Sequence, residues 1–290
     1  MLRRHRSAVP ALVVAGGYLA VVAVAAVVAA ATGDLAPLWR LTIAQEAGEG
    51  VAVTARDVAV PALTGLVWTW TLWQALRGPL AAPSPASGQE GEAGQQVGQE
   101  QQVGRARVAL YAAAATWLLY MVLPSWPWWA AVIEAVTMWA VVLLLHPVLG
   151  DGLERPGVAR TAGVLGFGGA VVDEVLDLLD LPVPDESALI VGVAALVWTV
   201  LVLRAQRGDD RWRPATVAYG IAALVLPLLG LLVPAVLALT GTAIASDSAL
   251  VGGLAAAAGA VQVIWLTRSG HDLASPGLAV PARRTAAPTG

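Results

Sequence analysis

The residues of this sequence best suited to chemistry are carboxylates that stand in or beside long apolar stretches. Glu134 lies about seven residues into the apolar run 128–149, roughly 10 Å from its start at about 1.5 Å of helix rise per residue. An ionisable side chain is costly inside a lipid bilayer, so a carboxyl at this depth is suited to binding a proton or a cation. The alternative interpretation is a buried carboxyl that a neighbouring Thr, Trp or Arg satisfies.

A second group of carboxylates, Asp173, Glu174, Asp177 and Asp180, closes a shorter apolar stretch. At about 100° per residue, Asp173, Asp177 and Asp180 fall within an arc of about 60° on a helix, and Glu174 stands to one side. Such a stripe could draw cations into a cavity between helices, or it could be the solvated face of a short helix that leaves the bilayer. Together with Glu134, the residues Asp173, Glu174 and Asp177 form the candidate intramembrane polar site.

Several other kinds of site find no support in the sequence. The chain has no Cys, which rules out disulfides, thiolate metal sites and a Cys nucleophile. No His/Glu pair stands at metal-ligand spacing, and Gly163, Gly166, Gly168 and Gly169 match neither a phosphate-binding loop nor a dinucleotide fingerprint. Close helix packing is their expected role. The sequence therefore predicts no catalytic residue, no metal and no cofactor, and an intramembrane enzyme is the least favoured class.

The chain that carries these residues has the composition of a membrane protein. Apolar residues make up 58% of it and charged residues 13%, with a mean hydropathy of +0.71. Ala, Val and Leu form long runs, several of which reach the roughly 20 residues that a helix needs to cross a bilayer. Seven runs predict an all-α bundle of membrane-spanning helices: 8–31, 58–76, 108–123, 128–149, 188–203, 215–239 and 249–267.

An eighth span depends on the stretch 158–181, whose uncharged part, 161–172, is short enough for a re-entrant segment. Cytoplasmic loops carry the excess of basic residues near membrane spans, and all 17 basic residues of this chain are Arg. If 158–181 crosses, 15 Arg residues lie in the cytoplasm and 2 outside; if it does not, the split is 8 against 9. The sequence therefore predicts eight spans with both termini cytoplasmic, or seven if 158–181 is re-entrant.

The organisation of the chain follows from these spans. Segment 78–107 is rich in Gly, Gln and Glu and cannot bury enough apolar surface to fold, so it is predicted to be a disordered cytoplasmic loop. The same holds for the tail. The predicted parts are the first two spans with an extracytoplasmic loop at 32–57 (1–77), the disordered loop (78–107), a hairpin of two spans (108–149), spans five and six (150–203), an Arg-rich loop with the last two spans (204–268), and the disordered tail (269–290).

A short internal similarity links the second and sixth predicted spans. Leu66–Thr69 recurs as Leu196–Thr199, and with the same spacing Arg77 and Gly78 recur as Arg207 and Gly208. In the eight-span topology the two segments occupy equivalent places in two halves of four helices, as a parallel duplication requires. Chance similarity between two apolar helices that both contain Trp and end in Arg is the alternative.

The lipid bilayer is the first predicted partner, and the Arg-rich loop 204–213 is expected to meet anionic lipid headgroups rather than nucleic acid. One hypothesis is a permease for a small solute or ion, based on Glu134, the acidic stripe and the Pro-interrupted run 215–239. The alternative is a non-catalytic scaffold, assembly or regulatory protein that contacts a protein partner through 78–107. The use of Arg without Lys is typical of a high-GC bacterium, so the bacterial cytoplasmic membrane is the expected location.

Overall fold

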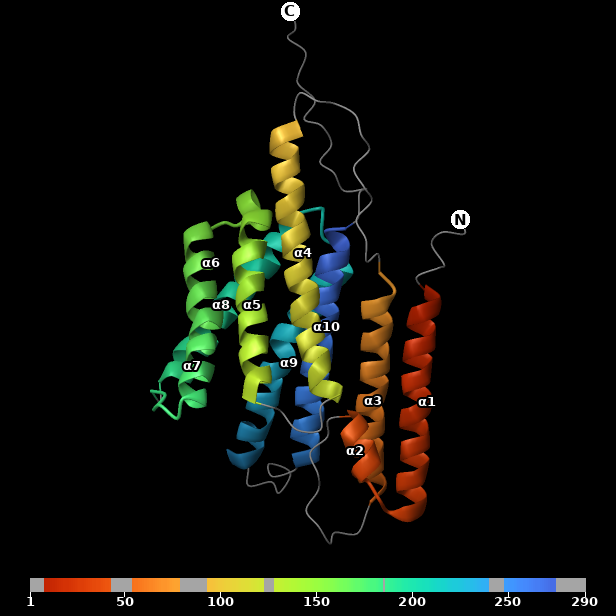
Figure 1. The fold of residues 1–290 in the computed structure, drawn as a ribbon. Coiled ribbons are helices and arrows are strands. Elements are labelled where there is room, and N and C mark those ends of the chain that lie inside the picture. The colour runs from red at the N-terminus through yellow and green to blue at the C-terminus, as the bar shows by residue number, and fades with distance from the viewer. Residues whose placement is uncertain are drawn as a thin grey trace, which may run out of the picture.

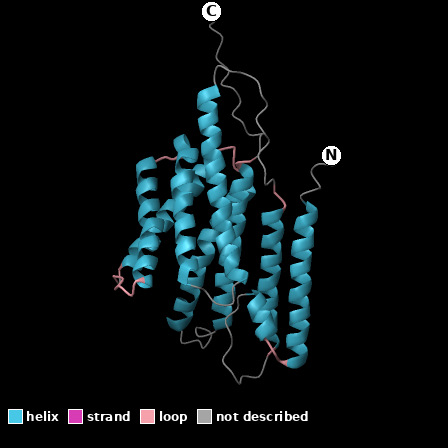
Figure 2. Ribbon diagram, viewed as in Figure 1, coloured by secondary structure: helices cyan, strands magenta, loops and turns pink. Residues whose placement is uncertain are grey.

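The computed structural model of the protein describes residues 8–42, 54–78, 93–122, 128–184, 186–239 and 248–274. All regular structure in these ranges is helical, as the sequence predicts (Figure 2). The α-helices are α1 (Ala8–Thr32), α2 (Ala36–Thr42), α3 (Ala55–Leu76), α4 (Ala93–Val122), α5 (Trp128–Leu149), α6 (Pro156–Gly163), α7 (Gly169–Leu178), α8 (Ser187–Gly208), α9 (Pro214–Leu239) and α10 (Ser248–Asp272).

The long helices run alternately up and down one bundle axis (Figure 1). α1 packs beside α3, α4 beside α5 and α9 beside α10, while α10 also contacts α3 and α4. α3, α5, α8 and α10 all finish at one end of the bundle, where α1, α6 and α9 begin. We call it the arginine end, because its helix ends and turns carry Arg77, Arg155, Arg204, Arg211 and Arg268. Arg40, on α2, lies at the opposite end.

The stretch that decides between seven and eight spans forms one unbroken helical rod beside α5 and α8. α6 continues into a π-helical segment, Val164–Gly168, and then into α7, 23 residues in all. At about 1.5 Å per residue the rod is roughly 34 Å long, which matches the ~30 Å hydrocarbon core of a bilayer. The rod is longer than its uncharged part because helix formation continues through Arg160 at one end and the acidic residues at the other.

Glycines bring this rod close to its neighbours, as the sequence predicts. A Cβ added at Gly166 would lie 2.5 Å from the backbone nitrogen of Ala195 on α8, closer than Cβ atoms approach in folded proteins, so one helix would have to shift. A Cβ at Gly163 would lie 2.4 Å from the side chain of Val142 on α5. The rod ends at Leu178, and Asp180, two residues beyond it, takes a left-handed φ of 54° that turns the chain away.

The outer surface of the bundle is apolar. Three helices are long and apolar enough to cross a membrane, namely Val9–Thr32, Trp129–Leu149 and Ser187–Gly208, and α9 adds the shorter apolar stretch Pro214–Gly230. Among the described residues, 36 large apolar side chains are exposed, nine of them on α1 alone. Soluble monomers rarely expose contiguous apolar surface on this scale, whereas helices that face lipid do.

Two segments that the sequence predicts to be disordered are helical in part. α4 begins at Ala93, so the prediction for 78–107 is wrong from there on, while 79–92 lie outside the described residues. Ala, Gln, Glu and Arg favour helix. The apolar half of α4 nucleates the helix, and extending a helix that already exists costs less free energy than starting a new one. α10 extends to Asp272, so the tail prediction is wrong for 269–272, and 275–290 lie outside the described part of the chain.

The two similar segments occupy similar environments. Trp68 and Trp198 are both fully buried in the same core. Thr69 and Thr199 each donate a hydrogen bond of 2.8 Å to the carbonyl four residues earlier. α3 packs against α1, and α8 packs against the α6–α7 rod, so each segment contacts the long helical element that precedes it. A duplication of four helices stays a prediction.

Candidate functional site

The predicted polar site is split between two neighbouring helices. Glu134 on α5 is half-buried, as are Asp173 and Glu174 on α7, whereas Asp177 is exposed. α5 and α7 are antiparallel and in contact, and a Cβ at Gly168 would lie 3.2 Å from the indole nitrogen of Trp139. Glu134 lies five residues before Trp139, and Asp173 lies five residues after Gly168. Because the two helical segments are antiparallel, the two carboxylates lie at a similar depth along the bundle.

These carboxylates do not form a metal site in the structure. The described residues contain no group of three or more His, Cys, Asp or Glu side chains that could hold a metal ion. The hydroxyl of Thr137 donates to the backbone carbonyl of Glu134 at 2.9 Å and also bonds Thr116 on α4 at 3.2 Å. Asp177 and Asp180 are exposed where the rod ends, as the solvated-face interpretation of the stripe requires.

A larger polar assembly lies at the arginine end, around Asp272 in the last turn of α10. The Asp272 side chain is only 3% exposed. Its Oδ2 accepts hydrogen bonds from the backbone N–H of Arg213, at 3.1 Å, and from the hydroxyl of Thr216, at 2.6 Å. Its Oδ1 lies 3.4 Å from Nε of Arg213. One carboxylate therefore satisfies donors at the start of α9, where the helix dipole favours negative charge.

A second buried contact ties α8 to α10. Gln206 is fully buried, its amide oxygen accepts from the indole N–H of Trp265 at 3.1 Å, and its amide nitrogen donates to the Ser269 hydroxyl at 3.3 Å. Buried polar groups need such partners, because an unpaired one costs about 1–3 kcal/mol. The arginine end is thus held by specific hydrogen bonds as well as by apolar packing.

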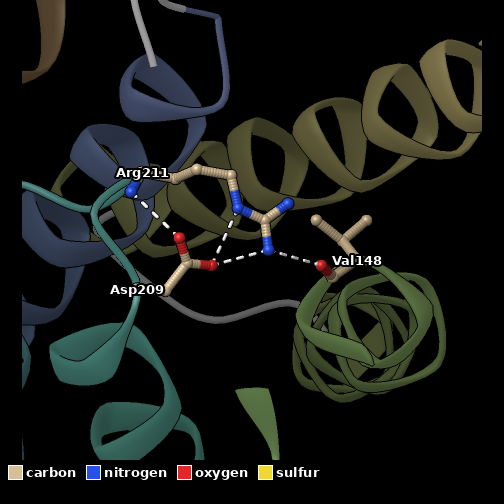
Figure 3. Close-up of polar contacts among 3 residues, drawn as sticks. All are labelled: Val148, Asp209 and Arg211. Carbon is tan, nitrogen blue, oxygen red and sulfur yellow. Dashed lines mark hydrogen bonds and ion pairs between the residues drawn. The ribbon is translucent and has the colours of Figure 1, made fainter. Parts of the chain in front are cut away.

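The turn between α8 and α9 is fixed to α5 by an arginine (Figure 3). The Asp209 carboxylate accepts from the backbone N–H of Arg211 at 2.9 Å and from its Nε at 2.8 Å, while Nη2 of Arg211 donates to the carbonyl of Val148 at 3.0 Å. Although partial burial raises the pKa of Asp209, the hydrogen bonds and charge of Arg211 outweigh it and hold that pKa below its ordinary value. Arg211 thus places positive charge at the end of α5, where the dipole favours it.

His271 is buried between α10, α4 and the end of α3. Its ring lies 5.7 Å from that of Tyr111, and a Cβ at Gly78 would lie 2.0 Å from it, so the glycine makes room for the imidazole. His271 lies beyond the predicted span 249–267. Burial lowers its pKa to about 4, and the positive charges of four arginines add to this effect: Arg268, Arg107, Arg213 and Arg77. The imidazole is therefore neutral at physiological pH.

Aromatic side chains surround the same end. The guanidinium carbon of Arg268 lies 5.6 Å from the centre of the Tyr219 ring, and the Tyr219 hydroxyl accepts from the indole N–H of Trp70 at 3.2 Å. Trp70 is 49% exposed on α3. Trp and Tyr side chains are typical of the boundary between headgroups and acyl chains.

Two shallow grooves open at the arginine end. The first groove, of about 340 Å³, lies between α4, the end of α5 and the turn before α9, and its lining residues are Gly98, Gln99, Gln102, Val103, Pro147, Val148 and Arg211. The second groove, of about 320 Å³, lies between the end of α8 and the start of α9, and its lining residues are Gln206, Arg207, Trp212, Pro214, Val217, Ala218 and Ile221. Both are open to the surface and accessible to a partner.

Sequence reasoning misses this polar assembly, and one signal could have found it. The predicted last span stops at Thr267, yet Ser269 and Asp272 continue the helical spacing of three and four residues from Trp265. A short side chain and an acid on the buried face of a helix indicate a satisfied polar contact. The partners of these residues, 206, 213 and 216, cannot be read from spacing because they lie on other helices.

Comparison with known proteins returns no match: no family model, no curated protein and no solved structure is similar to this chain.

Proposed function

We propose that the chain is an eight-span protein of the bacterial cytoplasmic membrane with both termini in the cytoplasm. The α6–α7 rod supplies the eighth span, since its length suits the bilayer and it runs antiparallel to α5 and α8. The gathering of Arg77, Arg155, Arg204, Arg211 and Arg268 at one end supports the cytoplasmic assignment of that end, because basic residues are retained on that side.

Within that membrane frame, we propose that the protein is a non-catalytic anchor or scaffold that holds a cytoplasmic partner at the arginine end. The observation that carries this proposal is the length of α4. α4 has 30 residues and projects past its neighbours at this end, where its first half, residues 93–107, forms an arm that is rich in Gln (Figure 1). A membrane span of about 20 residues does not need this extension, and the extension presents polar side chains beyond the apolar bundle.

The arm and the first groove form one continuous surface. Gln99 and Gln102 are exposed on the arm, and they line the groove with Pro147 and Val148 at the end of α5. Arg211 lines one end of the groove and is already held by Asp209 and the Val148 carbonyl. Its side chain therefore loses little conformational entropy when a partner binds. The exposed amide side chains of the groove both donate and accept hydrogen bonds, so they suit a partner segment with polar main-chain or side-chain groups.

Site-specific photocrosslinking in cells tests the scaffold. A photoreactive residue in place of Gln102 is expected to give one defined protein adduct, and the same residue in place of Val28, exposed on α1, is expected to give none. Gln99→Pro interrupts the arm at a cost of about 3 kcal/mol to helix formation and is expected to abolish the adduct. Equal adducts at both positions, or an adduct that survives Gln99→Pro, contradict the proposal.

A permease is the second candidate, and the similar depth of Glu134 and Asp173 on adjacent helices favours it. In that reading the two carboxylates share a proton or a cation at the α5–α7 contact. Purified protein in vesicles would then move a solute or ion, and Glu134→Gln would abolish the flux while Asp177→Asn, at an exposed position, would not. Flux that is unchanged in Glu134→Gln removes this carboxyl from the mechanism.

A further inference from the structure

The second groove combines a charged rim with an apolar wall. Arg207, exposed in the last turn of α8, and Gln206 lie on the polar side, while Val217, Ala218 and Ile221 of α9 form the apolar side. Trp212, which is 4% exposed, and Pro214 close the end nearest the turn. The groove therefore has the polarity of a molecule with a charged head and an apolar body.

The position of the groove along the bundle matches the same kind of molecule. Ile221 begins an exposed apolar strip on α9 that continues through Val225, Leu228, Leu229 and Leu232, toward the opposite end of the bundle. α8 runs beside α9 and has the exposed residues Val193, Val197 and Val200 between the opposite end of the bundle and the groove. The groove thus lies where the apolar outer surface of the bundle meets the charged turn.

Charge at the mouth of the groove is positive. Arg207 lines the groove and is exposed, and Arg204 is exposed one turn earlier on α8. The only ion pair that Arg204 makes among the described residues is a 3.9 Å contact with Glu154, in which both side chains are about two-thirds exposed. Such a contact is weak and leaves the guanidinium able to bind another anion.

We propose that this groove binds one anionic phospholipid of the cytoplasmic leaflet. The phosphate pairs with Arg207 at the mouth, and the acyl chains follow Val217 and Ile221 onto the apolar strip of α9. Opposite charge selects the headgroup, and the continuity of the groove with the apolar surface selects a lipid over a free phosphate. The inference rests on the proposed membrane orientation, which puts the arginine end at the cytoplasmic leaflet.

Native mass spectrometry of the detergent-purified protein tests this proposal. Phosphatidylglycerol is expected to give one bound lipid with about fivefold higher affinity than phosphatidylcholine with the same acyl chains. Both lipids carry a phosphate, but the choline cation cancels the charge of phosphatidylcholine, whereas pairing one arginine with a net anionic lipid contributes about 1 kcal/mol. Arg207→Gln is expected to remove this preference, and Arg155→Gln, at an exposed arginine outside the groove, is expected to keep it. Ala218→Trp fills the groove and is expected to weaken both lipids.

Three outcomes overturn the proposal. An equal lipid preference in Arg207→Gln and the unchanged protein shows that Arg207 does not select the lipid. Tight lipid binding by folded Ala218→Trp shows that the lipid does not bind in the groove. Competition by inorganic phosphate at concentrations comparable to those of the lipid assigns the site to a free anion. Labelling of Asp210→Cys in intact cells distinguishes a failure of the membrane orientation from a failure of the lipid site. Labelling from outside overturns the orientation. If Asp210→Cys is protected and Arg207→Gln keeps the lipid preference of the unchanged protein, only the lipid site is overturned.

Discussion

Asp272 offers the sharpest test of how the arginine end is held together. It receives the backbone N–H of Arg213 and the hydroxyl of Thr216, and its side chain is 3% exposed. Replacing it by Ala removes the acceptor for both donors and the charge at the start of α9. Asp272→Asn removes the charge but keeps an amide oxygen that can accept one of the two hydrogen bonds.

The size of the effect follows from these contacts. A hydrogen bond to a charged group contributes about 1.5–3 kcal/mol, and a helix cap contributes about 1 kcal/mol. The ion pair adds at most about 1 kcal/mol because the Arg213 side chain is 59% exposed. Contributions that share one carboxylate are not additive. We therefore expect Asp272→Ala to lower the free energy of unfolding by about 3 kcal/mol and Asp272→Asn by about 1–2 kcal/mol.

Unfolding in mixed detergent micelles, followed by Trp fluorescence, measures both values. Thr216→Val removes one donor and is expected to cost about 1–2 kcal/mol, and its effect should shrink by about 1 kcal/mol in the Asp272→Asn background because the two side chains are coupled. Asp177→Ala, at an exposed acid of α7, is the control and should stay within about 0.5 kcal/mol. A loss below about 1 kcal/mol for Asp272→Ala would refute the reasoning.

Three further predictions concern other contacts between the helices. Because burial lowers the pKa of His271 from 6.5 to about 4, the unfolded chain binds its proton first, so stability is full above about pH 6.5 and is lost as the pH falls toward 4; His271→Gln should flatten the unfolding free energy measured across that window. Gly166→Ala should cost about 1–3 kcal/mol of unfolding free energy because its Cβ meets the backbone of α8, whereas Gly157→Ala, with open space around it, should be neutral or slightly stabilising. Gln206→Leu should cost about 1–3 kcal/mol because it leaves the buried Trp265 indole N–H without an acceptor, and a shift in Trp emission should accompany the loss.

Each of these has an outcome that contradicts it. A pH dependence that is identical in His271→Gln assigns the acid lability to other groups. Equal stability of the two glycine variants means that the backbone of α8 lies farther from Gly166 than the 2.5 Å between an added Cβ and the Ala195 nitrogen indicates. Gln206→Leu with unchanged stability would show that the indole N–H of Trp265 finds another acceptor.

Much of the architecture can be predicted from the sequence because lipid imposes simple rules. Helix length and hydropathy locate the long helices, and the Arg distribution favours a crossing at 158–181, for which the α6–α7 rod has the required length. The helical arm is missed because a Gln-rich composition predicts disorder on its own, although a neighbouring apolar helix lowers the cost of extending through it.

The polar assembly is hidden from sequence for a different reason. Asp272 binds residues 213 and 216, and Gln206 binds residues 265 and 269, so each contact joins helices that are far apart in the chain. Sequence reasoning ranks carboxylates by their depth in apolar runs and therefore selects Glu134 and the acidic stripe. It gives little weight to polar residues at helix ends, where tertiary packing decides which of them are buried.

The central claim is the eight-span topology with the arginine end in the cytoplasm, and labelling of single cysteines tests it most directly. The chain has no native Cys, so a Cys at Asp180 or at Asp210 is the only thiol, and both positions are exposed. With a membrane-impermeant maleimide on intact cells, we predict that Asp180→Cys is labelled and that Asp210→Cys is labelled only after permeabilisation. The reverse pattern, with Asp180→Cys protected and Asp210→Cys labelled, means either that the rod does not cross or that the whole bundle is inverted, and both contradict the account.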